Sequence, residues 1–114
     1  MLFHQMVNSA YKAIAHPVRR TIIERLSEGS ATVGQATRDL GVTKPAITKH
    51  LKVLEEAGVV SRVIDGRTHR LSLDLTPLDE ASQWLELQRN RWTQLLDNLE
   101  AYVAEKREIE KRRT

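Results

Sequence analysis

The chain has no cysteine, and this absence removes several kinds of chemistry at once. Disulfide bonds, thiolate nucleophiles and thiolate metal ligands are all excluded. Aromatic residues make up only 4% of the sequence, so Leu, Ile, Val and Ala must build most of the core. No apolar run is long enough to span a membrane, and residues 1–17 lack the charged-then-apolar pattern of a secretion signal. The sequence therefore predicts a cytoplasmic protein without a membrane segment.

The sequence also lacks the motifs of an enzyme. It contains no Gly-rich phosphate loop and no spacing that pairs a nucleophile with a base. Ser27, Ser30 and Ser61 are placed as helix caps and turn residues. We therefore expect no catalytic residues and no cofactor.

What remains is a small, folded and mildly basic chain. Its 114 residues include 40% apolar and 29% charged residues, with a net charge of +3 and a pI of about 9.5. This size predicts one domain, over residues 1–104, followed by a charged tail at 105–114 that is expected to fray. The alternative for this tail is a basic arm that touches phosphates. A basic balance is compatible with nucleic acid but does not establish it, since many basic proteins bind none.

Helical patterns occupy the first half of the chain. The His16-Pro17 pair separates the first two predicted helices, because a residue before proline avoids helical geometry. Thr32 and Thr43 are suited to cap the third and fourth helices, and glycines end the last three. The predicted segments are 7–15, 17–29, 32–41 and 43–58.

The pattern changes at Val59. Two short β-prone runs, 59–64 and 69–75, are joined by Asp-Gly-Arg-Thr, and Asp-Gly between such runs is a strong hairpin signal. A long helix follows, with Thr76 as its predicted cap and Pro77 at its first position. The predicted fold is mainly α with a small β-hairpin, in the order α-α-α-α-β-β-α.

The third and fourth helices, joined by the tight turn Gly41-Val42, have the pattern of a helix-turn-helix. In that motif the second helix enters the major groove of DNA and its first half reaches the base edges. Ile47, Leu51 and Leu54 commit one face of this helix to the core. The exposed face that is predicted to contact DNA consists of Lys44, Pro45, Thr48, Lys49 and Lys52.

These residue types are suited to reading a groove. Lysine donates to guanine or to phosphate, and threonine offers a hydroxyl and a methyl group. Glu55 and Glu56 come only at the far end of the helix, against the preference of the macrodipole. The alternative is a lysine-rich face that is merely solvated. His50 contacts either the groove or the protein's own core, and packing against the core is favoured.

The predicted hairpin is also basic. Arg67 next to Gly66 is placed at the tip, where it is expected to contact the DNA backbone or the minor groove. Arg62 is a second predicted contact from this hairpin. For Arg62 and Arg70, an equally good explanation is that positive charges on edge strands discourage aggregation.

Three stretches together resemble the ArsR/SmtB family of bacterial winged helix-turn-helix repressors: residues 13–26, 31–62 and 65–73. Thr48-Lys49-His50-Leu51 resembles the family's Ser-x-His-Leu signature, with threonine in place of serine. The resemblance implies a symmetric homodimer that binds double-stranded operator DNA near its own promoter. It also implies that transcription is blocked until something, such as a small-molecule inducer of unknown identity, releases the protein.

The sequence departs from the metal-sensing members of that family. Their Cys-x-Cys pair aligns with Thr32 and Gly34, which cannot replace it, and the last predicted helix contains no histidine. The chain resembles the cysteine-free branch, and we expect no metal site. A winged-helix module that binds other proteins and no DNA is the alternative function.

The last predicted helix has more apolar surface than one small domain needs. Leu78, Leu85, Trp92 and Leu99 are each seven residues apart, which suits packing against a second copy. Some of these residues could instead cover the chain's own core. A cavity between the long helices is a further hypothesis, as a site for a small apolar ligand. The predicted dimer interface, with help from the first helix, consists of Phe3, Met6, Tyr11, Leu85, Trp92, Leu95, Leu99 and Tyr102.

Overall fold

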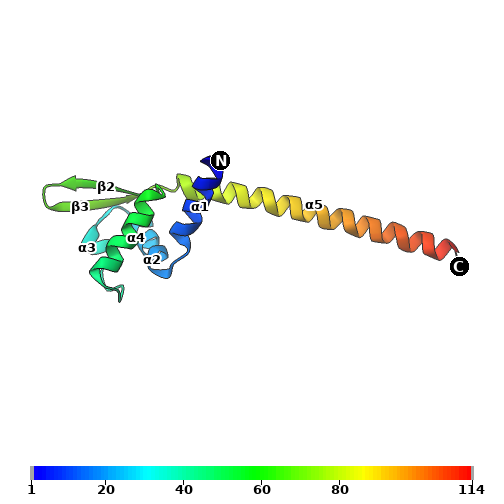
Figure 1. Cartoon of the computed structure of the whole chain (residues 1–114), viewed down its shortest axis with the longest axis horizontal. Coiled ribbons are helices and arrows are strands. Elements are labelled where there is room, and N and C mark those ends of the chain that lie inside the picture. The colour runs from blue at the N-terminus through cyan, green and yellow to red at the C-terminus, as the bar shows by residue number, and fades with distance from the viewer. Residues whose placement is uncertain (1, 114) are drawn as a thin grey trace. The chain divides into compact units, whose positions relative to one another are not determined.

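The structure, a computed structural model, describes residues 2–113, with side chains from residue 5 onward. It divides into two compact units, which meet in sequence between Ala81 and Ser82. The elements are α1 (Leu2–Ile14), α2 (Pro17–Ser27), β1 (Ala31–Thr32), α3 (Val33–Ala36), α4 (Lys44–Glu56), β2 (Val60–Asp65), β3 (Thr68–Leu73) and α5 (Thr76–Arg113) (Figure 1). The predicted mainly helical fold with a β-hairpin is confirmed, with one short strand added.

The core of the first unit lies between α2, α4 and the base of the hairpin. Ile22 of α2, Leu54 of α4 and Leu71 of β3 are completely buried, together with Val59 just before β2. These residues come from segments far apart in the sequence, so burying their side chains fixes α4 against both α2 and the sheet. The apolar face predicted for the fourth helix is therefore confirmed.

The sheet contains three antiparallel strands in the order β1-β3-β2. The hairpin is in the register Val60↔Leu73 to Asp65↔Thr68, so only Gly66 and Arg67 form its loop. Gly66 has a φ of 61°, which the first position of such a two-residue turn requires. The strand β1 was not predicted, because two residues are too short to show a strand period; it exists through long-range pairing of Ala31 with Leu71.

Several helix ends differ from the prediction. α1 begins at Leu2 instead of residue 7, and α3 ends at Ala36 instead of residue 41. Thr32 does cap α3, in a reciprocal arrangement with Gln35. The predicted cap of the last helix was wrong, since Thr76 is the first residue of α5 and donates its N–H to Asp74 Oδ1 at 3.0 Å. Hydrogen bonds from Thr76 lower the pKa of Asp74.

The second unit is the part of α5 from Ser82 onward. It is helical through the charged segment as far as Arg113, and the fraying expected there stays a prediction. Its apolar side chains are exposed along most of its length within the single chain. None of the helices within residues 2–113 is long and apolar enough to cross a membrane.

Candidate nucleic-acid interface

Local chemistry fixes where α4 begins and which side of it faces outward. The Thr43 hydroxyl accepts a hydrogen bond from the N–H of Ala46 at 3.3 Å, and Pro45 lies in the first turn, where its missing N–H costs nothing. Leu51 and Leu54 are buried, and Ile47 packs partly against the same core. The side left exposed contains all of the predicted contacts on this helix: Lys44, Pro45, Thr48, Lys49 and Lys52.

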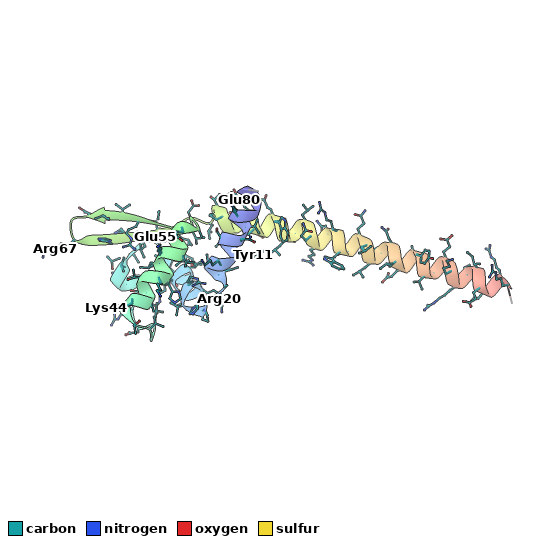
Figure 2. All side chains as sticks on the ribbon, viewed as in Figure 1. Tyr11, Arg20, Lys44, Glu55, Arg67 and Glu80 are labelled. Atoms are coloured by element: carbon teal, nitrogen blue, oxygen red, sulfur yellow. The ribbon has the colours of Figure 1, made fainter. Side chains whose placement is uncertain are left out.

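The positive charges of this face are largely uncommitted. Among residues 2–113, neither Lys44 nor Lys49 takes part in a recorded ion pair. Lys52 lies 3.8 Å from Glu56 one turn along, but both side chains are well exposed, so this pair contributes little. The ammonium groups are therefore available to phosphate or base edges, and Figure 2 shows Lys44 at the start of α4.

Thr48 uses the one donor of its hydroxyl within the helix and keeps its acceptor capacity. Its hydroxyl donates to the carbonyl of Lys44 at 3.2 Å, within the helix. The oxygen lone pairs and the methyl group remain exposed. Thr48 is therefore suited to accept from a base amino group or to pack on a thymine methyl.

Arg67 lies at the tip of the hairpin, as the sequence predicted (Figure 2). Its side chain is exposed, and no ion pair recorded within residues 2–113 includes it. An open groove of about 450 Å³ lies between the hairpin and the start of α3. Its lining residues are Thr32, Val33, Gly34, Arg62, Arg67, Thr68 and His69.

Arg62 is held by the protein itself. Its Nε lies 2.7 Å from Oε1 of Glu55 on α4, and its NH1 lies 2.9 Å from Nδ1 of His69 on β3. We call Glu55, Arg62 and His69 the wing clasp, since these residues join the recognition helix to both strands of the hairpin. The clasp was not predicted, because Glu55 and Arg62 belong to different elements. Contact between Arg62 and DNA stays a prediction, and it would compete with these bonds.

His50 packs against the protein, which confirms the favoured interpretation. Its Nδ1 lies 3.0 Å from NH1 of Arg19, and its ring is 4.3 Å from the ring of His16. Burial lowers the pKa of His50, and the neighbouring His16 and Arg19 lower it further. Only three-dimensional contact reveals Arg19 and His16, which lie 31 and 34 positions away in the sequence.

The predicted dimer residues are mostly exposed in the single chain. Tyr11 is half-buried, and the side chain of Phe3 lies outside the described residues. Val103 and Ile109 extend the exposed apolar surface and were missed, although Ile109 follows Tyr102 at the same seven-residue spacing. The exposed members of the predicted set are Met6, Leu85, Trp92, Leu95, Leu99 and Tyr102.

The positions that hold cysteine in metal sensors serve another purpose here. The hydroxyl of Thr32 accepts from the N–H of Gln35 at 3.2 Å and caps α3. Within the part of the chain that the structure describes, no three His, Asp or Glu residues gather as a metal site would require.

Comparison with known proteins agrees with this geometry. A helix-turn-helix domain family matches residues 14–63. The transcriptional repressor SdpR of Bacillus subtilis is 34% identical over 79 residues, which cover 69% of this chain and 88% of that protein. The HTH-type transcriptional regulator Rv2034 of Mycobacterium tuberculosis is 40% identical over 78 residues, or 68% of this chain and 73% of that protein. A crystal structure of an ArsR family transcriptional regulator superimposes with a TM-score of 0.74 at 29% identity, covering 78% of this chain and 92% of that one.

The chain belongs to the ArsR/SmtB family. It is a winged helix-turn-helix regulator of transcription in which α4 is the recognition helix and the β2–β3 hairpin is the wing. Its relatives are regulators and not enzymes, in agreement with the sequence prediction. The absence of cysteine places it with ArsR members that lack a thiolate metal site.

Proposed function

We propose that this ArsR-family protein represses transcription by binding a palindromic operator as a homodimer, with Lys44, Thr48 and Lys49 of α4 in the major groove. The observation that carries the proposal is the exposed face of α4, where Lys44 and Lys49 have no recorded ion pair within residues 2–113. Arg67 adds a second exposed cation at the wing tip. The related SdpR is itself named a transcriptional repressor.

The exposed apolar residues of α5 support pairing with a second copy. Trp92, Leu95 and Leu99 are 64%, 48% and 50% exposed, which is a costly arrangement for a lone helix in water. Their near-heptad spacing is the pattern by which two helices bury such residues together. A twofold dimer would then present two recognition helices to half-sites about 34–36 Å apart.

The DNA contacts are tested by three alanine variants, measured by fluorescence anisotropy on operator duplexes selected from genomic fragments. Lys49→Ala should weaken binding to all duplexes about equally and reduce the slope of log affinity against log salt by about 1, since it removes one phosphate contact. Thr48→Ala and Lys44→Ala should instead change which base pairs are preferred, each by about 1–3 kcal/mol at one position.

Arg89→Ala is the matched control, because it removes the same charge from an exposed position of α5 outside the seven-residue apolar rows. It should leave both affinity and salt slope unchanged. If all three variants on α4 bind like the parent, the proposed face is wrong. If the parent retains no duplex in a filter-binding assay at modest salt, the alternative of a protein-binding winged-helix module replaces DNA binding altogether.

We further propose that a small apolar inducer releases the DNA. Its support is the surplus apolar surface of α5, where Leu96, Leu99 and Val103 are exposed. Thermal melts against a panel of apolar compounds test this hypothesis. A panel without any stabilising compound leaves regulation by an inducer without support.

A further inference from the structure

One arginine joins three helices behind the recognition face. The guanidinium of Arg19 on α2 donates to the carbonyl of Lys12 at 2.7 Å (from NH2) and 3.1 Å (from Nε), and to that of Ala13 at 3.2 Å. The last carbonyls of a helix have no partner within it, so Arg19 satisfies the end of α1. The remaining nitrogen, NH1, reaches His50 Nδ1 on α4 at 3.0 Å.

This contact lies on the opposite side of α4 from the DNA face. With 3.6 residues per turn, His50 is about 160° around the helix from Lys52. His50 is therefore placed to hold the helix from behind without touching the groove.

The bond also specifies the protonation state of His50. Arginine has only donors, so Nδ1 of His50 must accept and the ring must be neutral. His16 obeys the same requirement, because its Nδ1 accepts the N–H of Val18 at 3.1 Å and caps α2. The two rings lie 4.3 Å apart. Protonating His50 would therefore turn an acceptor into a donor and place a second cation beside the guanidinium of Arg19.

Within residues 2–113, no carboxylate forms a recorded ion pair with Arg19, His16 or His50. The titratable and charged groups that act on His50 are His16 before α2 and Arg19 on α2. From β2, Arg62 bonds Glu55 and not His50.

We propose that Arg19 and His50 are positioning residues for DNA binding. Their hydrogen bond fixes the position of α4 against α1 and α2, and it forms only while His50 is neutral. DNA affinity should then fall in mild acid through the loss of this bond. The proposal rests on DNA binding by α4, as argued above, and adds a determinant that lies outside the DNA face.

The burial that lowers the pKa of His50 supports this direction. Because the folded protein binds a proton at His50 less readily than the unfolded chain does, folding stability falls as pH drops through the ordinary value of 6.5. The loss continues until the pH reaches the lowered pKa of the folded state. At neutral pH the bond is intact.

The test compares operator affinity at pH 7.5 and 5.5 for the full-length parent and His50→Asn. The Oδ1 of asparagine is separated from Cβ by the same number of bonds as the Nδ1 of histidine, and it also accepts a hydrogen bond. Unlike histidine, asparagine does not titrate in this range. The parent should lose about ten-fold in affinity over this range, while His50→Asn should bind like the parent at pH 7.5 and lose several-fold less than the parent does. Arg19→Gln should bind about ten-fold more weakly at pH 7.5, the loss expected for a bond to a charged group.

Arg20→Gln is the matched control. Arg20 bonds the same end of α1, through the carbonyl of Ile14 at 2.8 Å, but has no recorded bond to His50. It should keep the parental pH profile. Equal profiles for the parent and His50→Asn would overturn the proposal, and so would a parent whose affinity rises in acid, which marks an imidazole attracted to phosphate. A parent that binds no DNA at pH 7.5 would instead refute the proposed function.

A second measurement tests the proposal even if the His50→Asn variant does not fold. NMR titration of the imidazole signals should show that the pKa of His50 rises in Arg19→Gln, since a neighbouring cation and a bond to the neutral ring are both lost. The same titration in Arg20→Gln should match the parent. An unchanged pKa of His50 in Arg19→Gln would show that the bond does not control its protonation.

Discussion

The wing clasp allows a direct choice between two roles for Arg62. If Arg62 holds the wing, removing its charge should mainly lower the free energy of unfolding, and the loss should depend on Glu55. If Arg62 binds DNA, removing its charge should mainly lower DNA affinity, and the loss should not depend on Glu55. The perturbations are Arg62→Gln, Glu55→Gln and the double variant, which remove one charge, the other, or both. Glu55→Gln keeps the size of the side chain, whereas Arg62→Gln also shortens it.

The structure sets the expected magnitude. The two side chains are 27% and 31% exposed and meet at 2.7 Å, between the limits of a surface pair and a buried pair. Exposed pairs contribute about 0.2–1 kcal/mol, whereas breaking a buried pair costs about 3–5 kcal/mol. We therefore expect Arg62→Gln to cost about 1.5–2.5 kcal/mol, including the donor lost by His69, with a coupling between Arg62 and Glu55 of about 1–2 kcal/mol.

The assay is urea denaturation, monitored by far-ultraviolet circular dichroism. All variants are measured at one protein concentration, because dimerisation adds to the apparent stability. Arg67→Gln is the matched control, since it removes the same charge from the same hairpin at an exposed position. It should change stability by less than about 0.5 kcal/mol while lowering DNA affinity. A coupling below about 0.5 kcal/mol, with Arg62→Gln weakening DNA binding alone, would refute the clasp and restore Arg62 as a DNA contact.

Two further predictions concern the dimer and the core. Leu99→Glu should shift the protein to monomers in sedimentation experiments, because it puts a charge at the centre of the exposed apolar row. Glu105→Gln on the same helix should not change the oligomeric state. A dimer unaffected by Leu99→Glu would remove α5 from the interface. Leu54→Ala should destabilise the fold by about 2–5 kcal/mol in the same urea assay, since Leu54 is completely buried between α4 and its neighbours. The exposed Val63→Ala should cost far less, and equal losses would contradict the assigned core.

The sequence predicted elements that depend on contacts within one segment. Three predicted features of α4 are local, and each was confirmed: the cap at Thr43, the position of Pro45 in the first turn, and the spacing of Leu51 and Leu54. The hairpin followed from Asp65-Gly66 in the same way, because a two-residue turn is encoded by its own residues. The exposed lysines of α4 could be named by subtracting its core face.

Predictions failed where a segment depends on distant partners. The strand β1 exists only through pairing with β3, and α3 stops at Ala36 although its sequence pattern continues. Asp39 adopts a left-handed φ of 54° shortly afterwards, a backbone geometry that a helix does not contain. At the start of α5 the accepting side chain is that of Asp74 and not of Thr76, and Asp74 Oδ1 binds the N–H of Thr76 itself.

By itself, the sequence determined the helix-turn-helix, the wing and the absence of thiolate chemistry, because periodicity, turn residues and composition are properties of neighbouring positions. Tertiary structure alone decided which basic side chains have hydrogen-bond partners within the protein. Lys44 and Lys49 face solvent, whereas Arg62 and Arg19 are bound to Glu55, His69 and His50, although all four are basic residues in a basic chain. The physical reason is that the availability of a charge depends on what the fold places within hydrogen-bond distance of it, and no one-dimensional pattern contains that distance.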